Sequence, residues 1–273
     1  MVTPPQERTD APPKPQGLLL ERTVLDTQMR ANRADDARPW GVLPWLGPLL
    51  TLLALIVGSN LLAAYALPEH GTGRTVAGVV LTIGGEVVLL AALLAFGRSI
   101  AARNGGWRAA FGLDRIRGGD WLPWIVGVGF AYVGRTAVGV VANLLTDGRA
   151  AAQASNVQLS HPGPLAIVVL ALTAVVLAPV AEELMFRGLI LRTFMRRLSF
   201  WPAALLSTAL FGLFHVYEVH TVLGAVTLAC EVAVLGLCNS YLVRITGRLT
   251  PGIMVHASLN AIALAVAVGT ALR

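Results

Sequence analysis

Two adjacent glutamates and an arginine form the densest group of ionisable residues within an apolar part of the sequence. Glu183 and Arg187 are four residues apart, so on a helix they share a face, with the acid on the favourable N-terminal side. Glu182 is rotated from that face by about 100° and lacks this partner. An unpaired carboxyl group in a site of low dielectric constant is suited to accept and return protons at neutral pH. Two acids beside one base also leave surplus negative charge, which disfavours a purely structural role for both.

His215 is the first candidate partner for the glutamates. It ends the apolar run 211–215, Phe-Gly-Leu-Phe-His. Glu183 lies fourteen residues before Arg197, and His215 lies fourteen residues after Trp201, so an antiparallel helical hairpin places both at similar depth. A lone histidine in an apolar helix is usually a hydrogen-bonded packing residue. The neighbouring carboxylates favour a chemical role here.

His256 and Asn260 form a second candidate pair, because their four-residue spacing stacks them on one helix face. An imidazole beside an amide can bind a metal ion or water, or donate hydrogen bonds to a developing oxyanion. By simple counting, His256 is shallower than Glu182, since it lies only eight residues beyond Arg248. Two arrangements reconcile these depths: a cavity open to the cytoplasm, or residues 251–252 already sunk in the protein.

The composition excludes a soluble globule. Of 273 residues, 55% are hydrophobic and 13% are charged, and the mean hydropathy is +0.68, whereas soluble domains carry about 25% charged residues. The net charge of +6 does not indicate nucleic acid, because no basic run with interleaved aromatic residues occurs. Both cysteines lie in one apolar segment, so we expect neither a disulfide framework nor a cysteine-based zinc site.

Seven apolar stretches are long enough to cross a bilayer, for which about 20 residues are needed. In lipid each must be helical, so the sequence predicts an all-α, polytopic transmembrane bundle. The stretches are Leu43–Ala66, Val76–Phe96, Trp121–Leu145, Leu165–Leu191, Trp201–Val219, Leu223–Val243 and Ile253–Leu272.

Basic residues alternate between the stretches that connect these spans. One set of alternate stretches holds sixteen Lys and Arg, and the other set holds three. Because cytoplasmic loops collect basic residues, this pattern predicts a cytoplasmic N-terminus and an external C-terminus. We therefore expect an integral multi-pass protein of the plasma membrane.

The sequence also predicts the structure of two segments outside the expected spans. Residues 1–40 are rich in proline and mixed charge, which predicts a disordered tail. Residues 97–120 combine five arginines with Trp107, Phe111 and Leu113. That pattern suits either a short helix at the membrane surface or a solvated basic loop.

Three four-spaced motifs follow one another on successive apolar helices: Glu182-Glu183-x-x-x-Arg187, Phe211-x-x-x-His215 and His256-x-x-x-Asn260. Together they resemble the CPBP (ABI) intramembrane proteases, which include CAAX prenyl endopeptidases of the Ras-converting type and bacterial proteins of bacteriocin processing or immunity. The resemblance covers residues from about 165 to 272. The composition and the distribution of basic residues predict a disordered cytoplasmic tail over 1–40, and the resemblance implies a transmembrane protease domain over 41–273 whose core, 165–272, bears the motifs.

The resemblance implies an endopeptidase whose active site lies inside the bilayer. By motif position, Glu182 is the catalytic carboxylate that activates water, and His215 holds that water or assists the proton transfer. His256 and Asn260 stabilise the oxyanion. The residues expected to support this site are Glu183, Arg187 and Phe211.

The metal dependence of such a site has two readings. Glu182, His215 and His256 would make a three-ligand zinc site with an open position. However, no His-Glu-x-x-His helix is present, and Glu183 is committed to Arg187. A mechanism without a metal cofactor is therefore preferred, with zinc as the alternative.

The expected partners are the lipid bilayer and a peptide or protein substrate, either prenylated or a membrane-bound precursor, and not nucleic acid. One rival function is a non-catalytic immunity or scaffold protein that keeps the motifs. Another is a small proton-coupled transporter that uses Glu86, Arg135 and Glu231. These three are expected rather to neutralise one another or to face the bundle interior, with Glu86 and Arg135 as a candidate pair.

Overall fold

The computed structural model describes residues 24–27, 29, 46–51, 53–55, 58, 72–103, 105–150, 163–216, 219 and 221–271. Every regular element among them is a helix, and these residues form no strand. The predicted all-α fold is therefore confirmed. The expected disordered tail, 1–40, falls almost entirely outside the described residues.

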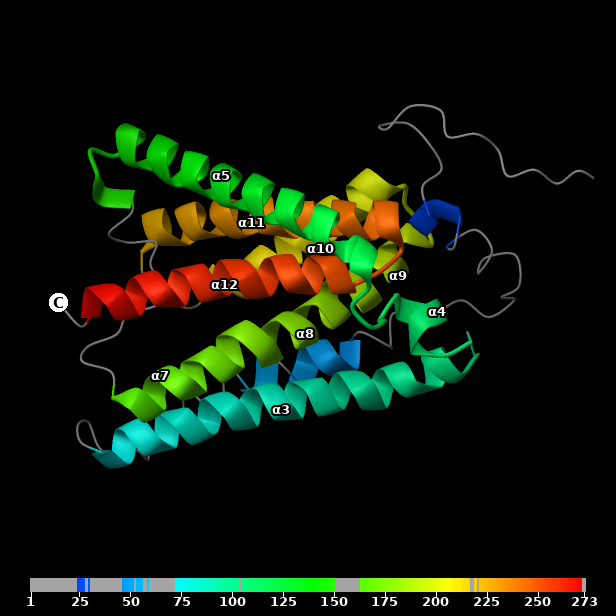
Figure 1. The fold of residues 1–273 in the computed structure, drawn as a ribbon, viewed down its shortest axis with the longest axis horizontal. Coiled ribbons are helices and arrows are strands. Elements are labelled where there is room, and N and C mark those ends of the chain that lie inside the picture. Colours follow the sequence, from blue (N-terminus) through cyan, green and yellow to red (C-terminus); the bar gives the residue numbers. More distant parts are fainter. Residues whose placement is uncertain are drawn as a thin grey trace, which may run out of the picture.

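The helices from residue 72 onward form a single bundle (Figure 1). They are α3 (Thr72–Arg103), α4 (Trp107–Phe111), the 3₁₀ turn η1 (Gly118–Asp120), α5 (Trp121–Leu145), α7 (Pro164–Ala171), η2 (Leu172–Leu177), α8 (Ala178–Glu183), η3 (Leu184–Ile190), α9 (Leu191–Met195), α10 (Phe200–Leu213), α11 (Val222–Thr246) and α12 (Thr250–Ala271).

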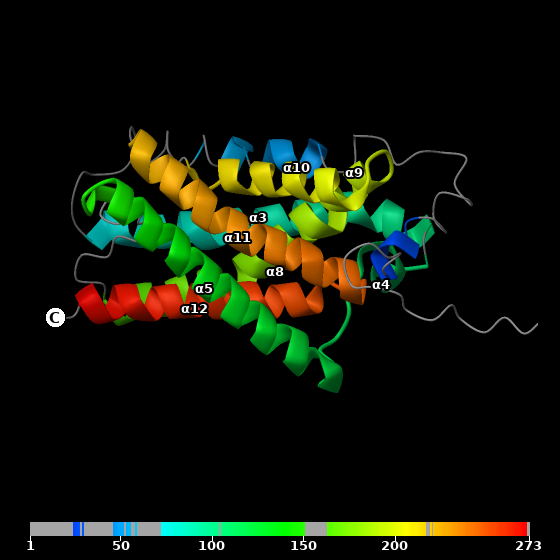
Figure 2. The same ribbon diagram turned by 90° about the horizontal axis from the view of Figure 1, so that it is seen from above.

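The long helices run along the length of the bundle, and when it is seen from above α5 and α11 both run obliquely to α12 (Figure 2). Helix α11 packs against α5, α10 and α12. Helix α3 packs on the opposite side, against α7 and α8. The helix that carries the glutamates is therefore flanked by α3 on one side and by α12 on another.

Five helical segments are long and apolar enough to cross a membrane: Ile83–Arg103, Gly118–Leu145, Pro164–Met195, Val222–Thr246 and Thr250–Ala271. They correspond to the second, third, fourth, sixth and seventh expected spans. The first and fifth correspond to shorter apolar helices, Leu46–Leu55 and Phe200–Leu213. At 14 residues, α10 reaches only about 21 Å, less than the roughly 30 Å hydrocarbon layer.

The segment Pro164–Met195 is continuous but irregular. Its turns widen to π geometry in η2 and again in η3, and the regular helix α8 lies between them. Both glutamates end α8, directly before the second wide turn. Single π turns within α-helices are frequent at functional sites. Simple residue counting along this segment, which assumes 3.6 residues per turn, does not anticipate them.

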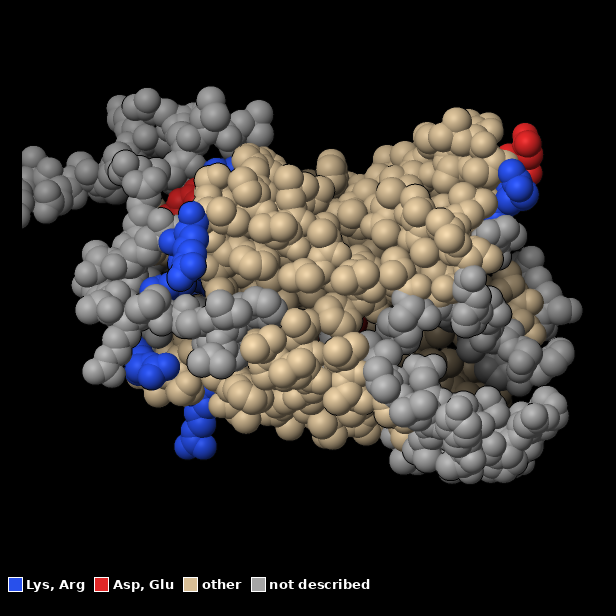
Figure 3. All heavy atoms as spheres, turned by 180° about the vertical axis from the view of Figure 1, so that it is seen from behind, with Lys and Arg blue, Asp and Glu red and all other residues tan. Residues whose placement is uncertain are grey.

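The segment 97–120 contains a short helix, α4. A short helix was one of the two structures expected for this segment from the sequence. Its apolar face packs on the protein: Phe111 and Ala110 are fully buried, and Trp107 contacts the core. Charged side chains on the face seen in Figure 3 gather at the two ends of the bundle, and the wide middle is almost free of them. We call the end that carries α4 the arginine end.

Candidate active site

Glu183 is the centre of a buried hydrogen-bonded group. Its Oε1 accepts from Arg187 Nη1 at 3.1 Å, from Asn239 Nδ2 at 2.9 Å and from His256 Nδ1 at 3.0 Å. The Glu183 and Arg187 side chains are both fully buried. The expected ion pair is thus formed inside the protein, and the hydrogen bonds from Asn239 and His256 join this fourth expected span to the sixth and the seventh.

Arg187 is held from its other side by an aromatic ring. Its guanidinium carbon lies 4.4 Å from the centre of the Phe211 ring, which is a cation–π arrangement. Gly236 on α11 makes room for it, because a Cβ there would lie 3.0 Å from Arg187 Nη2 and 2.7 Å from the methyl carbon of Thr208. Phe211 therefore contacts the charge that anchors Glu183.

Glu182 turns away from this group toward both histidines. Its Oε2 lies 3.6 Å from His256 Nε2 and 3.9 Å from His215 Nε2, and about a fifth of its side chain is exposed. Both distances are longer than a direct hydrogen bond. They leave the carboxylate and the two rings around a common space that suits a bridging water.

The two histidines are oriented in the same way but by different partners. His215 Nδ1 lies 2.9 Å from the Phe211 carbonyl, whereas His256 Nδ1 lies 3.0 Å from the Glu183 carboxylate. In each ring Nδ1 is therefore the donor, and Nε2 is presented to Glu182.

A cavity of about 260 Å³ opens at this cluster. Glu182, His215, His256 and Asn260 all line it. The Asn260 Nδ2 donates to the Ala174 carbonyl at 2.8 Å, which fixes the amide against the wide turn η2. The structure therefore brings the four candidate catalytic residues to one cavity.

The depth of His256 is explained by the burial of the turn before it. Residues 250–252 are buried, and the Leu249 amide donates to the Gly112 carbonyl at 2.9 Å, so the segment after α4 covers this turn. The Gly252 carbonyl in turn accepts from Asn239 Nδ2 at 3.1 Å. Of the two explanations drawn from the sequence, the sunken turn is observed.

Asn239 is a site residue that the sequence reasoning missed. It is fully buried on α11, and its amide joins Glu183 to the start of α12. The available signal was an amide within an apolar membrane helix, where polar side chains hydrogen-bond across helices.

A second polar group borders the cavity. Arg135 Nη2 lies 3.6 Å from Glu231 Oε2, so the ion pair joins α5 to α11, and the expected pair of Arg135 with Glu86 is not formed. Glu86 and Arg135 both line the cavity. Glu86 Oε2 has no hydrogen-bond partner among the described residues.

The described part of the chain contains no group of three His, Cys, Asp or Glu side chains placed to hold a metal ion. The three residues of the zinc alternative nevertheless share one space, with both Nε2 atoms facing the same carboxylate.

Residues 164–262 match the family model described as type II CAAX prenyl endopeptidase Rce1-like. The matched segment holds all three motifs, so the resemblance to the CAAX proteases is confirmed over it. No curated protein and no solved structure matches the chain. The family and the apolar helices identify the chain as an integral membrane protein that resembles membrane endopeptidases.

Proposed function

We propose that the chain is an intramembrane endopeptidase in which Glu182 activates the attacking water. The observation that carries the proposal is the cluster at the cavity: one carboxylate oxygen lies within 4 Å of two imidazole nitrogens. Glu182 is the only one of the adjacent glutamates that faces the cavity, since Glu183 is fully buried beneath it.

In the proposed reaction the Glu182 carboxylate takes a proton from water, and the water oxygen attacks the carbonyl carbon of the substrate. His215 accepts a hydrogen bond from that water at Nε2, because its Nδ1–H is held by the Phe211 carbonyl. The tetrahedral intermediate collapses when the carbon–nitrogen bond breaks, and the proton on Glu182 passes to the leaving nitrogen. The products are a carboxylic acid and an amine.

Two donors are available for the oxyanion of the intermediate. His256 donates from Nε2 when the ring is protonated, a charge that the Glu183 carboxylate stabilises through Nδ1. Asn260 uses one N–H for Ala174 and has a second on the same nitrogen. Preorganised donors of this kind contribute about 10²–10³ in rate each.

The substrate we propose is a membrane-associated peptide or protein, either prenylated near its C-terminus or a membrane-bound precursor. The matched family model supports a CAAX-type peptide. The test probe is therefore a quenched fluorescent peptide ending in a farnesylated CAAX sequence, with an unprenylated peptide of the same sequence beside it.

The decisive variant is Glu182→Gln, which keeps the shape of the side chain and removes its basicity. We expect cleavage by the purified protein to fall by about 10²–10⁴-fold with an unchanged melting temperature. Glu231→Gln is the matched control, because it alters a membrane-helix glutamate outside the cluster. Full activity of the Glu182→Gln protein would contradict the assignment. If neither the unaltered protein nor either variant cleaves any peptide, although all three are folded, the result would instead favour the non-catalytic rival.

A separate measurement tests whether cleavage depends on a metal ion. If Glu182 acts as a base on free water, cleavage should continue after prolonged treatment with a chelator. Loss of cleavage with a chelator and its return with zinc would reassign Glu182, His215 and His256 as metal ligands.

A further inference from the structure

A second pocket, of about 280 Å³, lies at the arginine end of the bundle. It is formed by α4, the segment that follows α4 and the turn between α11 and α12. It is lined by Gly105, Arg108, Ala109, Arg117, Thr246, Gly247 and Arg248. Among the described residues, three arginines and no acidic side chain thus form its wall.

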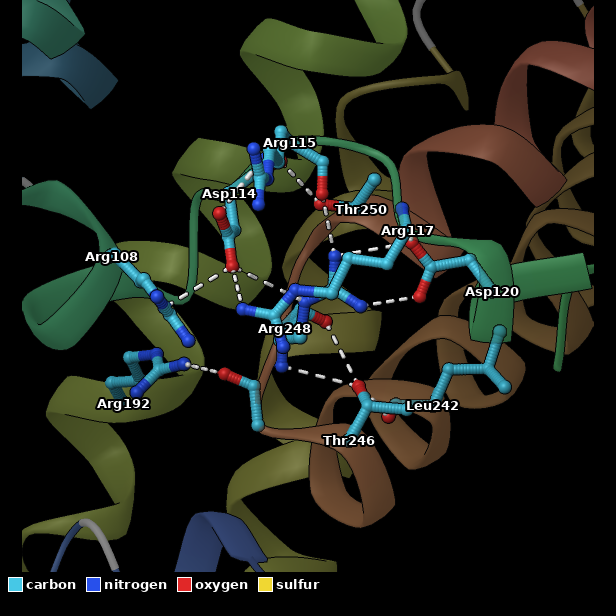
Figure 4. A network of polar contacts seen from close by, with 11 residues as sticks. Arg108, Asp114, Arg115, Arg117, Asp120, Arg192, Leu242, Thr246, Arg248 and Thr250 are labelled. Atoms are coloured by element: carbon cyan, nitrogen blue, oxygen red, sulfur yellow. Dashed lines mark hydrogen bonds and ion pairs between the residues drawn. The ribbon is translucent and has the colours of Figure 1, made fainter.

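Arg248 is held firmly in this wall (Figure 4). Its Nη2 donates to the Arg115 carbonyl at 2.7 Å and to Asp120 Oδ2 at 3.1 Å. The Arg117 amide donates to the same Asp120 oxygen at 2.7 Å. The guanidinium is therefore preorganised, and a ligand does not have to order it.

The carboxylates near the pocket do not balance its arginines. Asp114 Oδ2 is shared by Arg108 Nε at 3.1 Å, by Arg248 Nε at 3.7 Å and by Arg117 Nη2. With Asp120, two acids serve three guanidiniums, each of which has five N–H groups. The side chains of Arg108 and Arg117 are 70% and 38% exposed, so both retain donors for a ligand.

A buried arginine behind the pocket adds to the excess of positive charge. Arg192 is fully buried, and its Nη2 donates to the carbonyl of Gly247, a residue of the pocket wall, at 3.1 Å. Its Nε and Nη1 have no hydrogen-bond partner in the described part of the chain. A buried, uncompensated cation favours an anion nearby.

Exposed apolar side chains lie beside the pocket. Ile116 directly precedes Arg117 of the pocket wall, and Trp121 and Leu122 begin α5; these side chains are 67%, 58% and 53% exposed. Exposed tryptophan is enriched at the level of lipid headgroups. A ligand with a phosphate group and acyl chains matches both features, whereas a soluble anion matches only the arginines.

We propose that this pocket binds the phosphate group of an anionic lipid headgroup. Arginine forms paired, charge-assisted hydrogen bonds with phosphate, and basic pockets between membrane helices bind such headgroups. The site is separate from the cavity of Glu182, and it does not depend on the proposed protease activity.

The test uses the full-length protein in neutral detergent, titrated with phosphatidylglycerol and, separately, with phosphatidylcholine, and bound lipid is counted by native mass spectrometry. We expect one phosphatidylglycerol per chain at a concentration that leaves phosphatidylcholine unbound. Arg108→Gln with Arg117→Gln should weaken that binding by roughly 30-fold, about fivefold for each arginine at a membrane surface. Arg248 is left in place because it anchors Asp120.

The matched control is Arg98→Gln with Arg115→Gln, which removes two exposed charges near the same end but outside the pocket wall. This control should bind phosphatidylglycerol like the unaltered protein. Equal weakening in both double variants would show diffuse attraction and overturn the proposal, and so would unchanged binding in both, provided that melting temperatures agree. A third arm adds inorganic phosphate alone: displacement of the lipid at equal concentration would assign the pocket to a soluble anion and overturn the lipid.

Discussion

Two polar centres of the molecule, one around Glu183 and one around Asp114, hold charge in opposite ways. Around Glu183 a single buried carboxylate oxygen receives three donors from three helices. Around Asp114 a single carboxylate oxygen also serves three partners, but these are arginines at the edge of the protein. The first centre excludes water and fixes geometry, and the second stays open to a ligand.

The two centres differ in the substitutions that they can tolerate. Removing a member of the buried centre leaves an uncompensated charge away from water, which is costly. Removing a member of the exposed centre leaves groups that water can solvate, and exposed pairs contribute little. Substitutions at the buried centre should therefore lower the free energy of unfolding much more than substitutions at the exposed centre.

The largest effect is expected from Glu183→Gln. It leaves the buried Arg187 without a counter-charge, so we expect a loss of about 3–5 kcal/mol in the free energy of unfolding. Chemical denaturation in detergent micelles would measure it. Glu231→Gln, in a partly exposed pair, is the control and should lose much less. Similar losses in the two variants would remove the distinction between buried and exposed centres.

A smaller effect is expected from Gly236→Ala, which pushes a methyl group against Arg187 and Thr208. Overpacking of this kind costs about 1–3 kcal/mol. The same measurement on Gly129→Ala provides the comparison, since a Cβ at Gly129 meets nothing within 4 Å. Equal stability of the two alanine variants would mean that Arg187 can move, and that the buried centre is less rigid than we infer.

The smallest effect is expected at Asp114. Desolvation raises the pKa of Asp114, but hydrogen bonds from the Arg115 backbone and Arg117, with the nearby arginine charges, outweigh it and hold the pKa below its ordinary value. Its contribution is therefore present at neutral pH and is lost as pH falls below the ordinary Asp value of about 3.9. Melting curves of Asp114→Asn and the unaltered protein should differ slightly at pH 7 and converge in acid. A difference that grew on acidification would contradict this sign.

The pairing of Glu183 with Arg187 and the approach of Glu182 to His215 could be predicted from the sequence. Both follow from helical spacing and from an antiparallel hairpin, which are local properties. The helical class likewise follows from apolar length alone.

The remaining contacts depend on how distant helices cross. Asn239 meets Glu183 across 56 residues of sequence, and Arg135 pairs with Glu231 instead of Glu86. Charge and depth alone do not select between such partners. The depth of His256 was ambiguous for the same reason, because the cover over residues 250–252 comes from the segment after α4.

The wide turns of the glutamate helix have a consequence for how the bundle locks together. A π turn loosens the regular backbone pattern and offers carbonyl oxygens to other helices. The Ala174 carbonyl in η2 accepts from Asn260 of α12, and the Phe186 carbonyl in η3 accepts from Ser207 of α10 at 2.8 Å. The two irregular turns thus accept hydrogen bonds on either side of Glu182. Neutral side chains from two neighbouring helices thereby fix the position of the helix segment that carries the Glu182 carboxylate.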